Sequence, residues 1–365
     1  MRKAPHWIVA AILAVLVAAK FDPEAGFAPL IRFGSEWDRT RLAALEERDL
    51  AVATGSGYDG QFYAQLAIDP TLRDPGLATA LDAPAYRARR ILLPAIAHGL
   101  GWGDPGWILQ VFALLNAACW GLFAFLLQRE IAGQGPEAFA RWLGCVFSLG
   151  ALDSVRQSLV DLPALTLVLV AVRFSRRSEV RGAVACSGLA LLAKETSALA
   201  MLALLVHPLR RLNGWLLFAL SAVPLLVWMA YVTSRLPGGG TGLGNFTWPL
   251  WGVVLQSITS IREVATGNLD SRHVFALVGI AGLLLQAVVV LRLGRPSDPW
   301  WRIGAAHVAL LLVLGPWIWS GYWAACRALL PLTVAFNLLL PSGKRFWPLW
   351  VMGNLTLVHG VWRFL

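Results

Sequence analysis

Long apolar runs separated by short polar segments dominate the pattern of this chain. A run of roughly 20 apolar residues is long enough to cross the hydrocarbon core of a bilayer as a helix. The runs are rich in Leu, Ala and Val without strict alternation, which favours helices over a barrel. The pattern predicts about nine spanning helices, at 7–20, 106–128, 141–153, 158–173, 214–233, 273–291, 303–319, 326–341 and 346–362.

A further apolar run, 182–207, is interrupted by the polar pair Lys194-Glu195. Arginines flank it on both sides, at 174–181 and 208–213, and positive charge marks both flanks as cytoplasmic. Both flanks share one side only if the run enters and leaves the membrane through the same face. We therefore predict a pair of short half-helices or a re-entrant hairpin that turns near Lys194-Glu195.

Composition agrees with an all-α polytopic membrane protein, since 57% of the 365 residues are hydrophobic and 14% are charged. Arg2 and Lys3 place the N-terminus in the cytoplasm, and the formal net charge of +10 then lies on the cytoplasmic side of the predicted topology. Topology and attraction to anionic headgroups explain this basic balance, so nucleic-acid binding is not predicted. We expect a single integral domain, 1–365, in the lipid bilayer of the inner (plasma) membrane.

The longest polar segment, 21–90, follows the first apolar run and is predicted to be an ordered outer loop. Its helix-forming stretches, 37–53 and 61–68, favour small helices that lie on the membrane. The first run ends in small residues, which is compatible with signal-peptide cleavage as well as with a retained span. The Gly-rich piece 237–244 is predicted to be a flexible connection or a lid, and no GK[ST] follows to make it a phosphate loop.

Several kinds of chemistry lack their sequence signals. The four cysteines lie singly in or beside apolar runs and are expected to be packing residues. The six histidines are spread over different runs without ligand spacing, so no zinc site is predicted. No Gly-x-Ser-x-Gly elbow or dinucleotide fingerprint occurs, which leaves hydrolase and nicotinamide chemistry without support.

The predicted topology brings the ionisable residues at membrane depth to one outer face. Such residues are costly there, and a cluster with both signs favours a site for a charged substrate, for which an anionic lipid headgroup is well suited. The residues are Asp59, Asp153, Arg156, Asp161, Lys194, Glu195, Arg262, Glu263 and Arg327.

The most distinctive string is Gly57-Tyr58-Asp59-Gly60-Gln61-Phe62-Tyr63, in the outer loop. Glycine beside the carboxylate permits close approach of a substrate, and the aromatic side chains can stack on sugar rings. Asp59 is therefore a candidate general base, with Tyr58, Gln61 and Tyr63 as candidate substrate-binding residues. The alternative is a plain turn, because Asp-Gly is a strong turn signal and aromatic residues often anchor at the interface.

Basic residues are candidates for binding a phosphate. Lys194 can reach it as a point charge and Arg327 through bidentate contacts, with Glu195 as a neighbouring candidate. The alternative for Lys194 is an ion pair with Glu195 or Asp161 that neutralises a buried charge.

Four further arginines are candidates with open alternatives. Arg156 either binds a phosphate or acceptor or is a solvated loop charge. Arg87, Arg89 and Arg90, where the outer loop re-enters the membrane, either bind a lipid phosphate or snorkel to headgroups.

The first span, the outer loop with its aspartate, the later helices and the strings GLALLAKE at 188–195 and RALLP at 327–331 resemble the glycosyltransferase C (GT-C) superfamily. That superfamily includes protein O-mannosyltransferases and enzymes that add aminoarabinose to lipid A. The resemblance covers most of the chain. It implies a polyprenyl-phosphate-linked sugar donor, basic residues on its phosphate, and Asp59 as the acid that activates the acceptor. The Asp-x-Asp or paired-acid form is absent around Asp59, so the sequence does not support a divalent metal, and no other cofactor is predicted.

The sequence thus predicts a membrane glycosyltransferase that moves a sugar to a cell-envelope lipid, glycan or protein acceptor on the outer face. A transporter or flippase of a lipid-linked or anionic solute is the alternative, with 182–207 as its midplane site. Transporters usually show two related halves, whereas the long loop occurs once here, which favours the enzyme. A non-catalytic membrane subunit is a third alternative.

Overall fold

The computed structural model describes residues 4–46, 48, 50–131, 133–205, 212–236, 242–268 and 270–365. The predicted cytoplasmic arginines at 2 and 208–211 and most of the Gly-rich piece, 237–241, lie outside the described residues. The described residues form helices and turns, apart from two isolated bridges and one parallel strand pair, β1 (Phe33–Gly34) with β2 (Val52–Ala53). The all-α prediction is confirmed.

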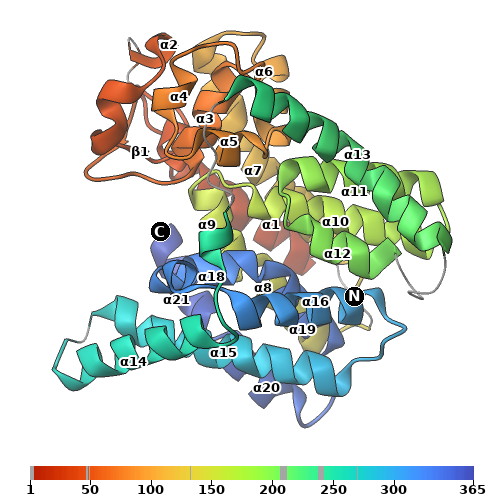
Figure 1. Cartoon of the computed structure of the whole chain (residues 1–365). Coiled ribbons are helices and arrows are strands. Elements are labelled where there is room, and N and C mark those ends of the chain that lie inside the picture. The colour runs from red at the N-terminus through yellow and green to blue at the C-terminus, as the bar shows by residue number, and fades with distance from the viewer. Residues whose placement is uncertain are drawn as a thin grey trace.

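The outer segment forms a folded unit with its own core, at the upper left of Figure 1 in red and orange. Leu30, Phe33, Leu66 and Leu77 are buried in that core, against residues of the helix that follows, such as Phe112. The elements are η1 (Ala28–Leu30), β1, η2 (Ser35–Thr40), α2 (Ala43–Glu46), β2, α3 (Gly60–Ile68), α4 (Leu77–Ala80), α5 (Pro84–Ala88) and α6 (Leu92–Leu100).

Two stretches of this unit were predicted as helices, and the structure separates them. α3 matches the prediction for 61–68. The stretch 37–53 is instead the end of η2, the four-residue α2 and the strand β2. Leu42 and Leu45 pack into the core of the unit, whereas the other described residues of this stretch are exposed or half-buried.

Around this unit the chain forms longer helices, several with visible start signals. α7 begins after Asp104, whose side chain accepts from the Trp107 amide, with Pro105 in the first helical position. α16 begins in the same way at Asp298 and Pro299. The helices outside the outer segment are α1 (Ala4–Ala18), α7 (Pro105–Leu127), α8 (Pro136–Val146), α9 (Leu149–Arg156), α10 (Asp161–Arg176), α11 (Val180–Ala193), α12 (Ser197–Leu205), α13 (Leu212–Arg235), η3 (Leu243–Asn245), α14 (Trp251–Ala265), α15 (Ser271–Leu293), α16 (Pro299–Val313), α17 (Pro316–Ser320), α18 (Tyr322–Ala328), α19 (Leu330–Leu339), α20 (Phe346–Gly353) and α21 (Thr356–Phe364).

The run 182–207 is broken where a turn was predicted. α11 ends at Ala193, α12 begins at Ser197, and Lys194 at the break pairs with Asp161 at the start of α10. At the other end of the same helices, Arg176 at the end of α10 pairs with Asp298 at 3.6 Å, and Arg302 donates to the carbonyl of Ala203 near the end of α12.

The contacts at the two ends define the direction of each helix. α10 and α12 run away from the break, whereas α11 runs toward it, so α11 and α12 form an antiparallel pair of half-helices. α13 packs along α11, and its C-terminal part reaches the outer segment, where Trp228 donates to the carbonyl of Ala88. Figure 1 shows these green helices side by side.

The C-terminal helices, in blue in Figure 1, pack with α8 and α9 around a second and larger core. Trp120, Trp300, Trp319 and Phe336 are among its fully buried side chains. Gly150 brings α9 against α18, because a Cβ there would lie 2.5 Å from the carbonyl oxygen of Cys326. This close approach places the following turn of α9 beside the functional residues of α18.

The structure does not confirm nine spans. Within the described ranges three helices, α7, α13 and α15, are long and apolar enough to cross a membrane, or up to five spans if the bent pairs α8–α9 and α18–α19 each count as one. The bends are 43° and 63°. α10 is 16 residues long and ends in arginines, and the apolar stretch 346–362 is divided into α20 and α21 at Asn354. Short apolar runs therefore became short helices, and the coarser prediction of several apolar helices that can span a membrane holds.

Candidate functional site

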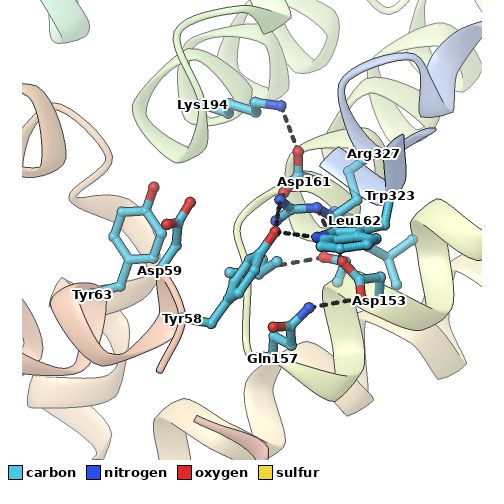
Figure 2. Close-up of polar contacts among 12 residues, drawn as sticks. Tyr58, Asp59, Tyr63, Asp153, Gln157, Asp161, Leu162, Lys194, Trp323 and Arg327 are labelled. Carbon is cyan, nitrogen blue, oxygen red and sulfur yellow. Dashed lines mark hydrogen bonds and ion pairs between the residues drawn. The ribbon is translucent and has the colours of Figure 1, made fainter. Parts of the chain in front are cut away.

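A cavity of about 560 Å³ lies where the outer segment meets the ends of the apolar helices. It collects residues that are far apart in the sequence, and Figure 2 shows Asp59 and Tyr63 on one side with Lys194, Asp161 and Arg327 on the other. Its lining is Asp59, Tyr63, Tyr86, Arg87, Arg89, Arg90, Leu159, Asp161, Lys194, Glu195, Thr196, Gly242, Asn245, Phe246, Leu310, Leu314, Trp317, Ile318, Ala324, Arg327 and Ala328.

Asp59 stands at the N-cap position of α3, where the helix dipole favours a negative charge. Its Oδ1 accepts from Nη2 of Arg87 at 2.9 Å, and Arg87 also forms a fork with Asp82 at 2.8 and 2.7 Å. The Asp59 side chain is 34% exposed, so it faces the cavity although it is paired. Burial opposes its ionisation, but the charges of Arg87 and Arg327 outweigh burial and lower its pKa below the ordinary value. Asp59 is therefore an ionised carboxylate at neutral pH.

Gly60 fixes the place of Asp59. A Cβ at Gly60 would lie 2.2 Å from the carbonyl oxygen of Gln157 and 2.8 Å from that of Ile31. Only a residue without a side chain lets the start of α3 approach these two backbone segments so closely. The Asp-Gly pair thus serves the packing of the loop as well as the exposure of the carboxylate.

Tyr58 connects the outer segment to α18. Its hydroxyl accepts from Nη2 of Arg327 at 2.7 Å and from the indole nitrogen of Trp323 at 3.0 Å (Figure 2). Burial raises the pKa of Tyr58 to about 12, with the nearby charge of Arg327 acting in the opposite direction. The phenol is therefore neutral, and it supports Arg327 from behind while Arg327 lines the cavity.

Arg90 makes the second connection, to the break between α11 and α12. Its guanidinium donates to both oxygens of Glu195, at 2.8 and 2.6 Å. It also donates to the hydroxyls of Tyr63 at 2.5 Å and Tyr86 at 2.7 Å. Two parallel hydrogen bonds from a planar guanidinium fix the orientation of a carboxylate more strictly than a single ion pair does. Arg90 and Glu195 therefore hold one wall of the cavity in a fixed geometry.

Lys194 and Arg327 share the carboxylate of Asp161. Nζ of Lys194 donates to Oδ1 of Asp161 at 2.5 Å, and Nη1 of Arg327 lies 3.7 Å from Oδ2. Arg327 also lies 3.2 Å from Oδ2 of Asp153, which is almost fully buried. The ion pair considered for Lys194 from the sequence is thus present, with Asp161 as the partner. Lys194 still lines the cavity, where it can also reach a bound anion.

Charged side chains of both signs line the cavity. Five are basic, namely those of Arg87, Arg89, Arg90, Lys194 and Arg327, and three are the carboxylates of Asp59, Asp161 and Glu195. Asp82 and Asp153 balance Arg87 and Arg327 from outside the lining, and the guanidinium and ammonium groups that line the cavity can donate to an anion. The apolar part of the lining comes mainly from α16, α17 and α18 and from the residue after η3, with Phe246, Leu310, Leu314, Trp317, Ile318, Ala324 and Ala328. The cavity thus suits a molecule with both a charged and an apolar part.

Several predicted site residues do not line the cavity, namely Tyr58, Gln61, Asp153, Arg156, Arg262 and Glu263. The side-chain amide of Gln61 bonds to the main chain. Its oxygen accepts from the Gly34 amide at 2.9 Å and its nitrogen donates to the Ser56 carbonyl at 2.8 Å, so Gln61 stabilises the loop. Arg156 ends α9 and lies near the charges of Arg32 and Arg363 instead. The pair at 262 and 263 ends α14, and neither side chain is in the lining. Their predicted roles in binding a substrate stay predictions.

The sequence reasoning missed other members of the lining. Tyr86 holds Arg90, and Asn245 donates to the Tyr86 hydroxyl at 3.4 Å. Asn245 and Phe246 follow the Gly-rich piece, which the sequence predicts to be a connection or a lid. A signal for Tyr86 existed, because it lies four residues before Arg90 in a short stretch dense in arginine.

Among the described residues no group of three or more His, Cys, Asp or Glu is placed to hold a metal ion. Comparisons were made with protein-family models, curated proteins and solved structures, and none of them matched the chain.

Proposed function

We propose that this chain is a membrane glycosyltransferase that moves a sugar from a polyprenyl-phosphate donor to an acceptor hydroxyl on the outer face of the inner membrane. The observation that carries the proposal is the cavity in which Asp59 of the outer segment faces a wall that carries the basic side chains of Lys194 and Arg327. A lipid-linked phosphate sugar has an anionic group, a polar sugar and an apolar chain. The charged and apolar walls of the cavity complement these three parts.

In the proposed reaction Asp59 accepts the proton of the acceptor hydroxyl as the general base. The acceptor oxygen forms the new bond to the anomeric carbon of the sugar. The bond between that carbon and the phosphate oxygen breaks, and its electron pair leaves with the polyprenyl phosphate. The lowered pKa of Asp59 keeps the carboxylate ready to take a proton at neutral pH.

Lys194 and Arg327 are the proposed ligands of the donor phosphate. Both line the cavity, and both are held by Asp161, so their charges are fixed before the substrate arrives. Preorganised positive charge favours the departing phosphate because it needs no rearrangement during the reaction. Arg89, in the same wall, stacks near the ring of Tyr86 at 5.8 Å and extends the basic surface.

The proposal includes a membrane arrangement in which the cavity faces outward. We place the outer segment outside the cell and the ends of α10 and α12, with Arg176 and Arg302, in the cytoplasm, which agrees with retention of positive charge on that side. α11 and α12 are then half-helices that enter from the cytoplasm and turn at Lys194 near the outer surface. In this placement the whole chain is one integral domain with a cytoplasmic N-terminus.

The break between α11 and α12 also favours a second candidate, a transporter or flippase of a lipid-linked or anionic solute. Broken helices with charged residues at the break are typical of transporter binding sites. In that case Asp59 would be a structural partner of Arg87 only.

One experiment separates the two candidates. Cell envelopes from strains with and without this chain are searched by mass spectrometry for a sugar-modified product. The proposal expects a product that is lost on deletion and restored by the wild-type chain but not by Asp59→Asn. Movement of a lipid-linked solute in proteoliposomes, with an unchanged set of envelope products, would replace the transferase by the transporter.

A further inference from the structure

A second group of basic side chains lies outside the cavity, behind the Tyr58–Arg327 contact. It consists of Lys20, Arg32, Arg156 and Arg363, and none of these residues lines the cavity. Arg32 and Arg156 follow and precede backbone segments that meet at Gly60, Arg363 lies 3.4 Å from Asp153 in the same turn of α9 as Arg156, and Lys20 donates to the main-chain oxygen of Leu365, two residues after Arg363. We call these four residues the basic cluster.

The packing of Gly60 explains why the cluster forms. The tight contact of Gly60 with the backbone of Ile31 and Gln157 brings the neighbours of these residues, Arg32 and Arg156, to the same place. The hydroxyl of Ser158 donates to the carbonyl of Leu30 at 3.0 Å and holds the two segments together. The backbone contacts between the outer segment and the turn after α9 thus bring Arg32 and Arg156 together.

The cluster has too little negative charge in the described part of the chain. Asp153 is the carboxylate nearest to it, with Arg363 at 3.4 Å. Asp153 is already shared, because it accepts from Gln157 at 2.7 Å and lies 3.2 Å from Arg327. Neither Arg32 nor Arg156 forms an ion pair with a described carboxylate, and Nη1 of Arg156 is buried without a hydrogen-bond partner there. Lys20 donates to the main-chain oxygen of Leu365.

An arrangement of this kind is unfavourable without an anion. Like charges repel, and a buried guanidinium nitrogen without a partner loses its hydrogen bonds to water without replacement. A phosphate would supply acceptors in the planar geometry that arginine prefers.

We propose that the basic cluster is a second anion site, which binds the phosphate group of the acceptor while the donor occupies the cavity. That the bound phosphate belongs to the acceptor rests on the proposed transfer function. The presence of an anion site at the basic cluster does not depend on it. Asp153 connects the two sites, because its Oδ2 faces Arg327 in the cavity wall and its Oδ1 faces Arg363 in the cluster.

Binding of inorganic phosphate tests the proposal without any transfer assay. The full-length protein in neutral detergent is dialysed to equilibrium against radioactive phosphate at low salt. Arg156→Gln and Arg32→Gln should each weaken binding at the cluster on the order of 10- to 100-fold. Lys194→Met should remove cavity binding only, and the exposed Lys344→Gln is the control for loss of one charge. Phosphate binding that is unchanged in both arginine variants would overturn the proposal.

Thermal unfolding gives a second readout whose sign distinguishes a binding site from a structural one. Without phosphate, Arg156→Gln should raise the unfolding midpoint, because it removes repulsion and an unpartnered donor, and phosphate should stabilise the wild type more than this variant. A midpoint that falls, with equal stabilisation of both by phosphate, would make Arg156 structural. If the wild type binds phosphate at the cluster alone, the anion site stands and the cavity assignment fails.

The source of the phosphate is read from competition. Nanodiscs of neutral lipid and nanodiscs with phosphatidylglycerol are compared for phosphate binding at the cluster in the Lys194→Met background. Competition by phosphatidylglycerol identifies a lipid headgroup as the natural occupant, and its absence identifies a phosphate-bearing acceptor from solution. A background in which phosphate no longer binds at all would contradict a second site.

Discussion

Arg90 and Glu195 are 105 residues apart in the chain, and both oxygens of Glu195 accept from Arg90, at 2.8 and 2.6 Å. The pair joins the end of the outer segment to the break between α11 and α12. Both side chains are largely buried, with 8% and 22% of their surface exposed. The fold therefore depends on a contact that sets the distance between the proposed base and the proposed phosphate ligands.

Removal of one partner from this pair should cost more than removal of both. Arg90→Met leaves a buried carboxylate without its cation, and the free energy of unfolding should fall by about 3–5 kcal/mol. The double variant Arg90→Met with Glu195→Leu should recover much of that loss. Chemical unfolding in detergent measures both, with the exposed Arg292→Met as control. Strictly additive losses would mean that the two residues act separately.

The donor-site assignment predicts a change in donor dependence. Lys194→Met and Arg327→Gln each remove a charged contact to phosphate, with an expected loss of about 1.5–3 kcal/mol. The donor concentration for half-maximal transfer should rise on the order of 10- to 100-fold. Steady-state rates over a range of donor concentrations provide the measurement. Folded variants with wild-type donor dependence would return both residues to a structural role beside Asp161.

The pH dependence of transfer follows from the lowered pKa of Asp59. A carboxylate with a lowered pKa contributes stability that is present above its ordinary value of 3.8 and is lost as the pH falls through the lowered value. Asp59 should likewise stay a competent base from neutral pH down to about pH 5. Arg87→Gln removes the main opposing charge while burial remains, so the acidic limb of the rate profile should move to higher pH. An unmoved limb would separate Arg87 from the ionisation of Asp59.

The sequence predicted the helical class, the break at Lys194 and most of the charged residues around the cavity. It could not predict their pairing, because Arg90 meets Glu195 only through the folding of the outer segment against α11. The sequence also could not predict which residues the Arg156 side chain lies near. Asp153 and Arg156 lie within one turn of α9, yet the first reaches Arg327 and the second reaches the basic cluster.

The number of spans was overestimated for a physical reason. An apolar run indicates that a segment is removed from water. It does not distinguish a short helix in a protein core from a helix that crosses the lipid, because both are apolar. α16 ends at Val313 before Gly315 and Pro316, and α18 and α19 are separated at Leu329, so one run of hydrophobic residues folds into two short helices. Such breaks depend on tertiary packing as much as on local sequence.

The proposed topology predicts which positions are open to each side. In a variant without the four cysteines, Ser178→Cys should react with an impermeant thiol reagent only after the membrane is permeated. Thr54→Cys, in the outer segment, should react in intact cells. Both positions are exposed on the protein, so burial does not decide the result. Ready labelling of position 178 from outside would invert the topology and place the cavity in the cytoplasm.

The matched variants Asp59→Asn and Gly60→Val separate catalysis from folding at the start of α3. Asparagine keeps an oxygen that can accept from Arg87, so thermal stability in detergent should change little. Valine at position 60 would drive a side chain into the carbonyl of Gln157, where even a Cβ would lie 2.2 Å away, so stability should fall. Loss of stability in both variants would assign Asp59 to folding.

The transfer rate of Asp59→Asn is the most direct measurement of the central claim. The purified chain in liposomes receives a polyprenyl-phosphate sugar and an envelope extract as acceptor, and the product is followed by mass spectrometry. The amide cannot take the acceptor proton, so turnover should fall by about 100- to 10,000-fold, while the protein stays folded. A transfer rate near that of the wild type in the folded Asp59→Asn variant would contradict the account, because Asp59 would then be only a partner of Arg87.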